Sequence, residues 1–148
     1  RERDVIFAGG LHDIIEDTEI TKEYLSQMFN PRVAFLVEAV SKKPKSCFPD
    51  KEEARLHEFH QRYLDCARCD SGVIWPKLAD RLHNLATLHG LHHDPSKQNR
   101  MARETLDFYI PFLDGEAKTL VATDFHPFLE SYRYKMYYLA MAFLDQTT

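Results

Sequence analysis

The chain lacks the features that mark membrane, secreted and nucleic-acid-binding proteins. No hydrophobic run approaches the roughly 18 residues of a membrane-spanning helix, and the first residues do not follow a signal-peptide pattern. One CxxC is present, at Cys66 and Cys69, but it has no second pair at zinc spacing, so we expect reduced thiols. The net charge of −4 gives no overall attraction for nucleic acid or anionic lipid. We therefore expect a protein of a reducing cytoplasm, with no nucleic-acid or membrane partner.

The composition is that of an ordinary globular domain. At 148 residues, with 44% hydrophobic and 28% charged residues, the chain is long enough to bury a core as one domain. Its segments follow helical periodicity, and none alternates with the two-residue period of a strand. We therefore predict an all-α fold in a single domain over 1–148. The expected helices cover 4–16, 22–28, 31–40, 50–69, a segment from 75 or 76, 95–109 and 128–144.

Residues that favour helix starts support several of these boundaries. Thr21 stands as an N-cap before the second expected helix. Asn30 and Pro31 give the same signal for the third, because proline suits the first helical position. Asp50 begins an acidic variant of the capping box, which predicts the start of the long helix that ends near Cys69.

Polar groups of metal-ligand type gather in the stretch LHDIIEDT, residues 11–18. On a continuous helix His12 shares a face with Glu16, and Asp13 with Asp17, because residues four apart are neighbours. Such groups at the edge of an apolar helix are costly to desolvate without compensation. A divalent cation compensates them, since imidazole and carboxylate together suit Mn, Fe or Zn. The alternative is a solvated helix end, where acidic residues are common.

A second stretch, KLADRLHNL at 77–85, weakens that alternative. Asp80 and Asn84 are again four residues apart, so they share one face of the expected helix. The other face is apolar, with Leu78, Leu82, Leu85 and Leu88.

With a third stretch, RMARETLDFYIP at 100–111, these motifs resemble the HD-domain phosphohydrolases, and specifically the hydrolase domain of the RelA/SpoT alarmone enzymes. The order and spacing of the stretches fit that family, and the resemblance covers roughly residues 4–113. It implies an HD-domain helical bundle, with 116–148 as a C-terminal helical extension. It also implies a first histidine ligand on an upstream helix that these residues lack. Gly9 and Gly10 depart from the family's larger apolar residues; they either admit close packing of another backbone or reflect sequence drift.

The resemblance assigns a role to the polar residues of the motifs. It implies Mn²⁺ as the cofactor, with another divalent metal as the alternative. The implied metal ligands, besides the upstream histidine, are His12, Asp13 and Asp80. The carboxylates implied to orient the attacking water and take its proton are Glu16 and Asp17. The residues implied to line the nucleotide pocket are Asn84 and Thr87, and the phosphate-contact candidates are Arg81, Lys97 and Arg100.

These roles lead to one expected activity and three alternatives. We expect the chain to remove the 3′-pyrophosphate of guanosine tetra- or pentaphosphate, which gives GDP or GTP and pyrophosphate. The first alternative is another nucleotide, NADPH or a deoxynucleotide, hydrolysed at the same metal site. The second is a non-catalytic nucleotide-binding domain, and the third is a structural helical module.

Other charged and aromatic residues allow simpler interpretations. The lysines of the loop over 41–49 are either solvated or form a rim that meets phosphates, and Arg55 and Arg62 are further phosphate candidates from the next helix. His57 and His60 lack the HExxH spacing of a zinc protease, so we expect them at the surface or at the edge of the core. The aromatic stripe of the last helix fits either core packing or a homo-oligomer surface.

Overall fold

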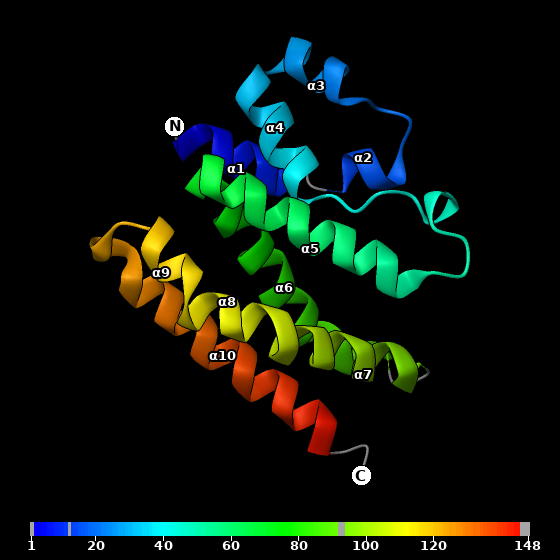
Figure 1. The fold of residues 1–148 in the computed structure, drawn as a ribbon, viewed down its shortest axis with the longest axis vertical. Helices are drawn as coiled ribbons and strands as arrows, with labels where there is room; N and C mark the ends of the chain where they lie inside the picture. The colour runs from blue at the N-terminus through cyan, green and yellow to red at the C-terminus, as the bar shows by residue number, and fades with distance from the viewer. Residues whose placement is uncertain (1, 12, 92–93, 146–148) are drawn as a thin grey trace. The chain divides into compact units, whose positions relative to one another are not determined.

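The computed structural model describes residues 2–11, 13–91 and 94–145, and every element in these ranges is helical (Figure 1). The all-α prediction is thereby confirmed. The chain forms two compact units, Arg1–Lys77 and Leu78–Thr148, called here the N-terminal and C-terminal units. Helix α6 (Ile74–Thr87) begins in the first and ends in the second. Over the described residues, no helix combines the length and the hydrophobicity that crossing a bilayer requires.

The N-terminal unit is built around α4, which packs against α1, α3 and α5. The face of α4 that meets these helices is fully buried, with Val33, Leu36 and Val37 at its centre. The elements of this unit, before α6, are α1 (Glu2–Leu11), α2 (Ile14–Asp17), α3 (Lys22–Met28), α4 (Pro31–Val40), η1 (Lys45–Cys47), α5 (Glu52–Cys69) and η2 (Ser71–Val73).

Two helix starts follow the local signals in the sequence. The Thr21 hydroxyl accepts a hydrogen bond from the Tyr24 amide at 3.2 Å, and α3 begins at the next residue. The Asn30 side chain likewise accepts from the Val33 amide at 2.9 Å, with Pro31 in the first turn of α4. Both caps satisfy amides that have no partner within the helix.

The expected helix over 4–16 is wrong as a continuous element. Helix α1 ends at Leu11, and a separate turn of helix, α2, begins at Ile14 after Asp13. Gly9 and Gly10 lie in the last turns of α1, where two glycines lower the helix propensity by about 2 kcal/mol against alanine. A Cβ added at either glycine meets no described atom within 4 Å, so close backbone packing does not explain them.

The expected capping box at Asp50 is also not formed. Asp50 has a φ of 57°, the left-handed conformation that aspartate tolerates better than most residues. Lys51 becomes the residue before α5, and no side chain caps the helix there. The start of α5 is therefore set by the turn rather than by a cap.

Arg32 ties three parts of the N-terminal unit together. Its Nε and Nη2 donate to the Asp70 carboxylate at 2.8 and 3.1 Å, and its Nη1 donates to Asp4 at 3.3 Å. The Asn30 side chain donates to the second oxygen of Asp4 at 2.9 Å. This hydrogen bond, together with Arg32, lowers the pKa of Asp4. Helix α1, the start of α4 and the end of α5 are thus held by one guanidinium.

We expect the Arg32→Met variant to lose about 2 kcal/mol of unfolding free energy, because half-buried hydrogen bonds between charged groups are lost. The difference from the wild type should shrink in acid. The pKa of Asp4 is lowered in the folded state, so its contribution is present at neutral pH and is lost as the pH falls through that value. Urea unfolding of both proteins at pH 7 and in acid checks this. An Arg32→Met protein as stable as the wild type at pH 7 contradicts it.

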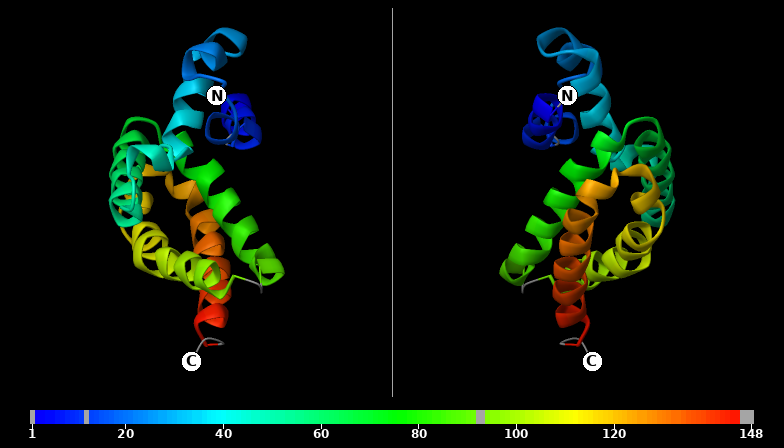
Figure 2. Two further views of the ribbon diagram at one scale, coloured as in Figure 1. Left: turned by 90° about the vertical axis from the view of Figure 1, so that its right-hand side faces the viewer. Right: turned by 90° about the vertical axis from the view of Figure 1, so that its left-hand side faces the viewer.

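In the C-terminal unit, α10 lies along α7 and α8, as Figures 1 and 2 show. Met136 and Ala140 of α10 are fully buried, so one side of the last helix, which carries the aromatic stripe, belongs to the core. After α6, the elements are η3 (Leu88–Leu91), α7 (Pro95–Glu104), the π-helical turn η4 (Thr105–Tyr109), α8 (Ile110–Asp114), α9 (Glu116–Leu120), η5 (Thr123–Phe125) and α10 (His126–Asp145).

The helix that begins at Pro95 continues further than the sequence predicts. It was expected to end at Tyr109, yet helical structure continues through Pro111 to Asp114. The π-helical turn just before this proline shifts the hydrogen-bond pattern, since the Ile110 amide donates five residues back to Thr105. The proline, which has no amide hydrogen, is then accommodated in the first turn of α8.

A buried ion pair joins α6 to α7 in the same unit. The Arg81 side chain is only 4% exposed, and its Nη2 lies 2.8 Å from Glu104. The guanidinium also lies over the Tyr109 ring, 4.7 Å from its centre. Burial by itself disfavours the charged form, but Tyr109 and Glu104 outweigh it and raise the pKa of Arg81. Arg81 was predicted to contact phosphate; here it is engaged inside its own unit.

We expect Arg81→Met to destabilise the protein by about 3–5 kcal/mol, because it leaves the Glu104 carboxylate buried without its partner. The double variant Arg81→Met with Glu104→Leu should recover most of this loss, since it removes both charges. Thermal and urea unfolding of the two variants measure the difference. Equal destabilisation in the single and double variants contradicts the role of the pair.

Candidate active site

The acidic turn that begins at Asp13 keeps the helical spacing predicted for it. Asp13 has helical backbone angles, and its carbonyl oxygen accepts from the Asp17 amide at 2.8 Å. The two residues therefore lie one turn apart. Asp13, Glu16 and Asp17 are all exposed to solvent. His12, the first predicted metal ligand, lies outside the described residues, so its role stays a prediction.

Glu16 contacts a part of the chain outside its own turn. One of its carboxylate oxygens, Oε1, accepts a hydrogen bond from the backbone amide of Lys42, just after α4. Glu16 and Asp17 line a cavity of about 450 Å³ that is also lined by Ile15, Glu38, Ser41, Lys42, Lys43, Pro44, Lys45, Arg55 and Arg62. Five of the lining residues are cationic and three are anionic. The cationic residues form a basic wall beside the predicted catalytic pair; they are Lys42, Lys43, Lys45, Arg55 and Arg62.

The cations of this wall differ in how far their charge is compensated. Lys43 lies 3.4 Å from Glu58, and Arg55 pairs with Glu52 at 3.2 Å. Lys45 is exposed and forms no ion pair with any described residue. From the sequence these residues were candidates for contact with phosphate, but they were not assigned to the predicted site. Their only sequence signal was a run of lysines on a loop.

Asp80 and Asn84 share one face of α6, as predicted. The Asn84 side-chain amide donates to Asp80 Oδ1 at 3.3 Å, and both side chains are half-buried. Of the predicted apolar face, Leu78, Leu85 and Leu88 are fully buried and Leu82 is half-buried; Leu88 lies just after the end of α6. The amide of Asn84 orients the carboxylate of Asp80, as partners of metal-binding carboxylates commonly do.

Three of the predicted substrate-binding residues come together in the C-terminal unit. Asn84, Thr87 and Lys97 line a cavity of about 340 Å³ with Gly90 and Met101. Two other predicted phosphate contacts do not line it. Arg100 is exposed on α7, and Arg81 is buried against Glu104.

The donor set suits a hard divalent cation. Asp13 belongs to the N-terminal unit and Asp80 to the C-terminal unit, and each offers carboxylate oxygens, which Mn²⁺ accepts together with imidazole. Among the described residues, which do not include His12, no three side chains of metal-ligand type are clustered. The metal site therefore stays a prediction from the sequence.

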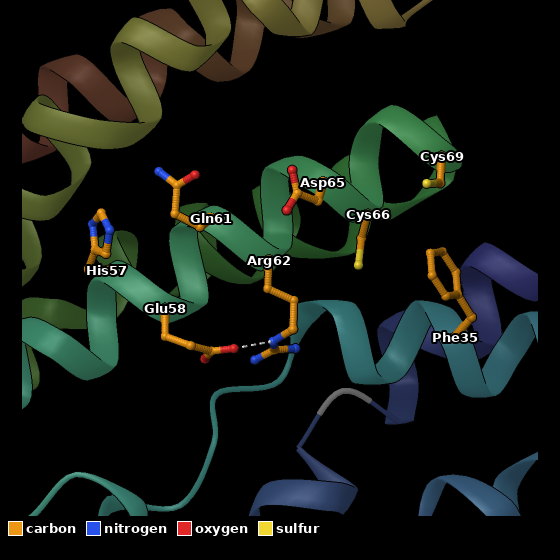
Figure 3. Close-up of a pocket in the computed structure, with 8 residues that line it drawn as sticks. All are labelled: Phe35, His57, Glu58, Gln61, Arg62, Asp65, Cys66 and Cys69. Carbon is orange, nitrogen blue, oxygen red and sulfur yellow. Dashed lines mark hydrogen bonds and ion pairs between the residues drawn. The ribbon is translucent and has the colours of Figure 1, made fainter.

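The remaining histidine and cysteine motifs have ordinary surroundings. His57 is exposed and His60 is half-buried against the Phe59 ring, which confirms the expected surface and core-edge positions. The cysteines are free thiols, and burial raises the pKa of Cys66, which disfavours a reactive thiolate. Figure 3 shows Cys66 on the side of α5 that faces Phe35 of α4, beside Arg62.

Comparisons with known proteins place these motifs in a family. A family model described as an HD domain matches residues 2–132. The bifunctional (p)ppGpp synthase/hydrolase SpoT of Escherichia coli (strain K12) is 45% identical over 108 residues, which are 73% of this chain and 15% of that protein. A probable guanosine-3′,5′-bis(diphosphate) 3′-pyrophosphohydrolase of Synechocystis is 45% identical over 107 residues, 72% of this chain and 14% of the relative. The GTP pyrophosphokinase of Myxococcus xanthus is 39% identical over 132 residues, 87% and 17% of the two chains.

The match covers most of this chain but only a small part of each relative, about 15% of the length of SpoT. The family assignment does not depend on the rest of those proteins, because the HD-domain model alone spans residues 2–132. The resemblance that the sequence motifs carry is confirmed by the same matches. The chain belongs to the HD-domain family and is a relative of the RelA/SpoT-type hydrolases.

Proposed function

We propose that this chain hydrolyses the 3′-pyrophosphate of guanosine tetra- or pentaphosphate and releases GDP or GTP with pyrophosphate. The observation that carries the proposal is the carboxylate pair Glu16 and Asp17 on the wall of a cavity that is otherwise rich in lysine and arginine. A polyphosphate substrate needs cations for its oxygens and a base for the attacking water, and this cavity offers both kinds of group. The activities named for the relatives support the choice of guanosine polyphosphate.

Hydrolases of the HD family depend on a metal, and we propose Mn²⁺ here. The residues that hold it are His12, Asp13 and Asp80. A bound divalent cation lowers the pKa of a water and draws charge from phosphate oxygens. The Asn84 amide keeps the Asp80 carboxylate in one orientation. Three thiols without disulfides agree with a reducing cytoplasm as the proposed compartment.

Glu16 and Asp17 have different roles toward the attacking water. Glu16 has one carboxylate oxygen bound to the Lys42 amide, so the other oxygen is directed away from that contact and takes the proton of the water. Asp17, in the same turn, orients the water toward the phosphorus atom. The basic wall then stabilises the negative charge that develops on the departing pyrophosphate. Lys45 is suited to this role because it has no carboxylate partner among the described residues.

The nucleoside part of the substrate is assigned to the cavity of the C-terminal unit. Asn84 offers a donor and an acceptor to a sugar or base edge, and Thr87 adds a hydroxyl. Lys97 is exposed at the same cavity and meets a phosphate. Arg100 remains a second phosphate contact from α7. We leave Arg81 out of this set, because a phosphate contact requires it to leave its buried pair with Glu104.

The test is a product assay with Mn²⁺ present. Guanosine tetraphosphate should give GDP and inorganic pyrophosphate, which ³¹P NMR distinguishes from stepwise loss of single phosphates. NADPH and deoxynucleoside triphosphates serve as competing substrates. Turnover of one of these without turnover of either guanosine polyphosphate contradicts the proposal. Binding of guanosine tetraphosphate in calorimetry without any product also contradicts it and indicates a nucleotide-binding domain.

Glu16→Gln should keep Mn²⁺ binding and lower kcat by about 100-fold or more, because the amide cannot accept the proton of the water. Its shape is nearly that of glutamate, so the melting temperature should stay close to that of the wild type. Steady-state kinetics with calorimetric titration of Mn²⁺ measure both properties. Full activity in this variant moves the base to another residue.

Asp80→Ala should lose Mn²⁺ binding and activity together, because it removes a charged oxygen ligand. Asn84→Ala is the matched variant on the same face of α6: it should weaken Mn²⁺ binding by about 10-fold, as expected for a partner that orients a ligand. Calorimetric titration with Mn²⁺ gives the stoichiometry and affinity. Wild-type stoichiometry in Asp80→Ala is the result that contradicts its role as a ligand.

A further inference from the structure

The end of α4 receives hydrogen bonds from a neighbouring helix. The last carbonyl groups of a helix have no donor within it and must find one elsewhere. Arg62, on α5, donates from Nη1 to the carbonyl oxygen of Glu38 and from Nη2 to that of Ser41, each at 2.6 Å. The Ser41 hydroxyl donates to the carbonyl oxygen of Val37 at 2.6 Å. Figure 3 shows the Arg62 side chain reaching from α5 to the end of α4.

Arg62 is itself held by an ion pair on its own helix. Its Nε lies 2.9 Å from Glu58 Oε1, one turn earlier. Burial by itself raises the pKa of Glu58, but the hydrogen bond and charge of Arg62 lower it below its ordinary value, so the carboxylate is ionised at neutral pH. Each of the three guanidinium nitrogens of Arg62 therefore has an acceptor. A lysine has no planar fork with which to reach both carbonyls and the carboxylate.

The segment that Arg62 holds is the one that fixes Glu16. Lys42 follows Ser41 directly, and its backbone amide donates to Glu16 Oε1. Glu16 is exposed and stands on α2, a helix of only four residues, so few other contacts restrict its side chain. The direction of the Lys42 amide depends on how the chain leaves α4. Arg62 binds the Ser41 carbonyl, which belongs to the same peptide group as the Lys42 amide, and Arg55 donates to the Lys43 carbonyl at 2.8 Å as a second anchor.

We infer that Arg62 is a positioning residue for Glu16: it clamps the end of α4 so that the Lys42 amide holds one oxygen of the Glu16 carboxylate. The inference rests on the proposed function for its effect on catalysis, but the contact itself can be tested separately. Arg62 also lines the cavity beside Glu16, so a direct phosphate contact is the competing role. Because three of its five N–H groups already bind the Glu58 carboxylate and the two carbonyls, we expect the loss of Arg62 to affect kcat more than KM.

The first arm of the test compares Arg62→Met, Arg62→Lys and Arg68→Met in Mn²⁺-dependent hydrolysis of guanosine tetraphosphate. Arg68 lies on the same helix and pairs with Asp65 at 3.0 Å at the surface, so its variant is the matched control. Arg62→Met should lower kcat by about 10- to 100-fold, as a misplaced catalytic group does, with KM changed less than about twofold. Arg62→Lys should recover part of kcat, and Arg68→Met should leave both constants unchanged. A raised KM with wild-type kcat in Arg62→Met overturns the positioning role.

The second arm measures hydrogen exchange at the Lys42 amide by NMR, without substrate or metal. Glu16→Ala and Arg62→Met should each speed exchange at Lys42 by about tenfold, the loss expected for one hydrogen bond. Amides in α6 and α10 should keep wild-type rates, which separates a local effect from unfolding. If all amides of the Arg62→Met protein exchange faster, the Arg62→Lys variant decides between the two explanations. An intermediate exchange rate at the Lys42 amide alone supports the clamp. A wild-type exchange rate at that amide overturns it.

The two arms separate this inference from the proposed function. Unchanged exchange at Lys42 in a folded Arg62→Met protein overturns the clamp even if the wild-type chain is an active hydrolase. A wild-type chain that turns over no guanosine polyphosphate contradicts the proposed function, while the exchange arm still decides whether Arg62 holds the Lys42 amide against Glu16.

Discussion

The cost of keeping several carboxylates close together is the constraint on which this account depends. Asp13, Glu16 and Asp17 occupy little more than one helical turn, and like charges at such spacing repel one another. The chain compensates them in part with its own groups, through the Lys42 amide on Glu16 and a wall of cationic side chains across the cavity. A divalent cation on Asp13 completes the compensation in the proposed function. Catalysis and charge balance then require the same groups.

Three arginines hold neighbouring helices of the surrounding structure together. Arg32 joins α1, α4 and the end of α5; Arg62 joins α5 to the end of α4; Arg81 joins α6 to α7. In each case a planar guanidinium binds several acceptors at once, which a lysine cannot do in the same geometry. The first two act in the unit that carries Glu16, and the third in the unit that carries Asp80. The contacts of Arg32 and Arg81 take no part in the proposed chemistry, whereas Arg62 is inferred to act on it through the Lys42 amide.

Several features governed by neighbouring residues were predictable from the sequence, although the expected capping box at Asp50 is not formed. The caps at Thr21 and Asn30 and the shared helix face of Asp80 and Asn84 depend only on residues up to four positions away, and each was confirmed. The break after Leu11 was missed, although two glycines before it were visible and weaken a helix. The family could be recognised from the spacing of the motifs, because that spacing is read directly from the sequence.

Features that depend on distant residues were not predictable. Nothing in the sequence around Arg81 distinguishes a buried partner of Glu104 from a phosphate contact. The two residues are separated by 23 in the sequence and come together only when the chain folds. The contact between the Lys42 amide and Glu16 likewise spans 26 positions and involves a backbone group, which no residue pattern reports. The basic wall was visible only as a lysine-rich loop. Its place beside Glu16 and Asp17, the predicted catalytic pair, depends on the packing of α4 and α5.

The proposed function requires that the imidazole and carboxylates of the two motifs bind one divalent ion. The most direct measurement is anomalous X-ray diffraction at the manganese edge from crystals of the chain grown with Mn²⁺. A single strong peak is expected within coordination distance of His12, Asp13 and Asp80. A chain saturated with Mn²⁺ whose peak lies away from these three side chains contradicts it.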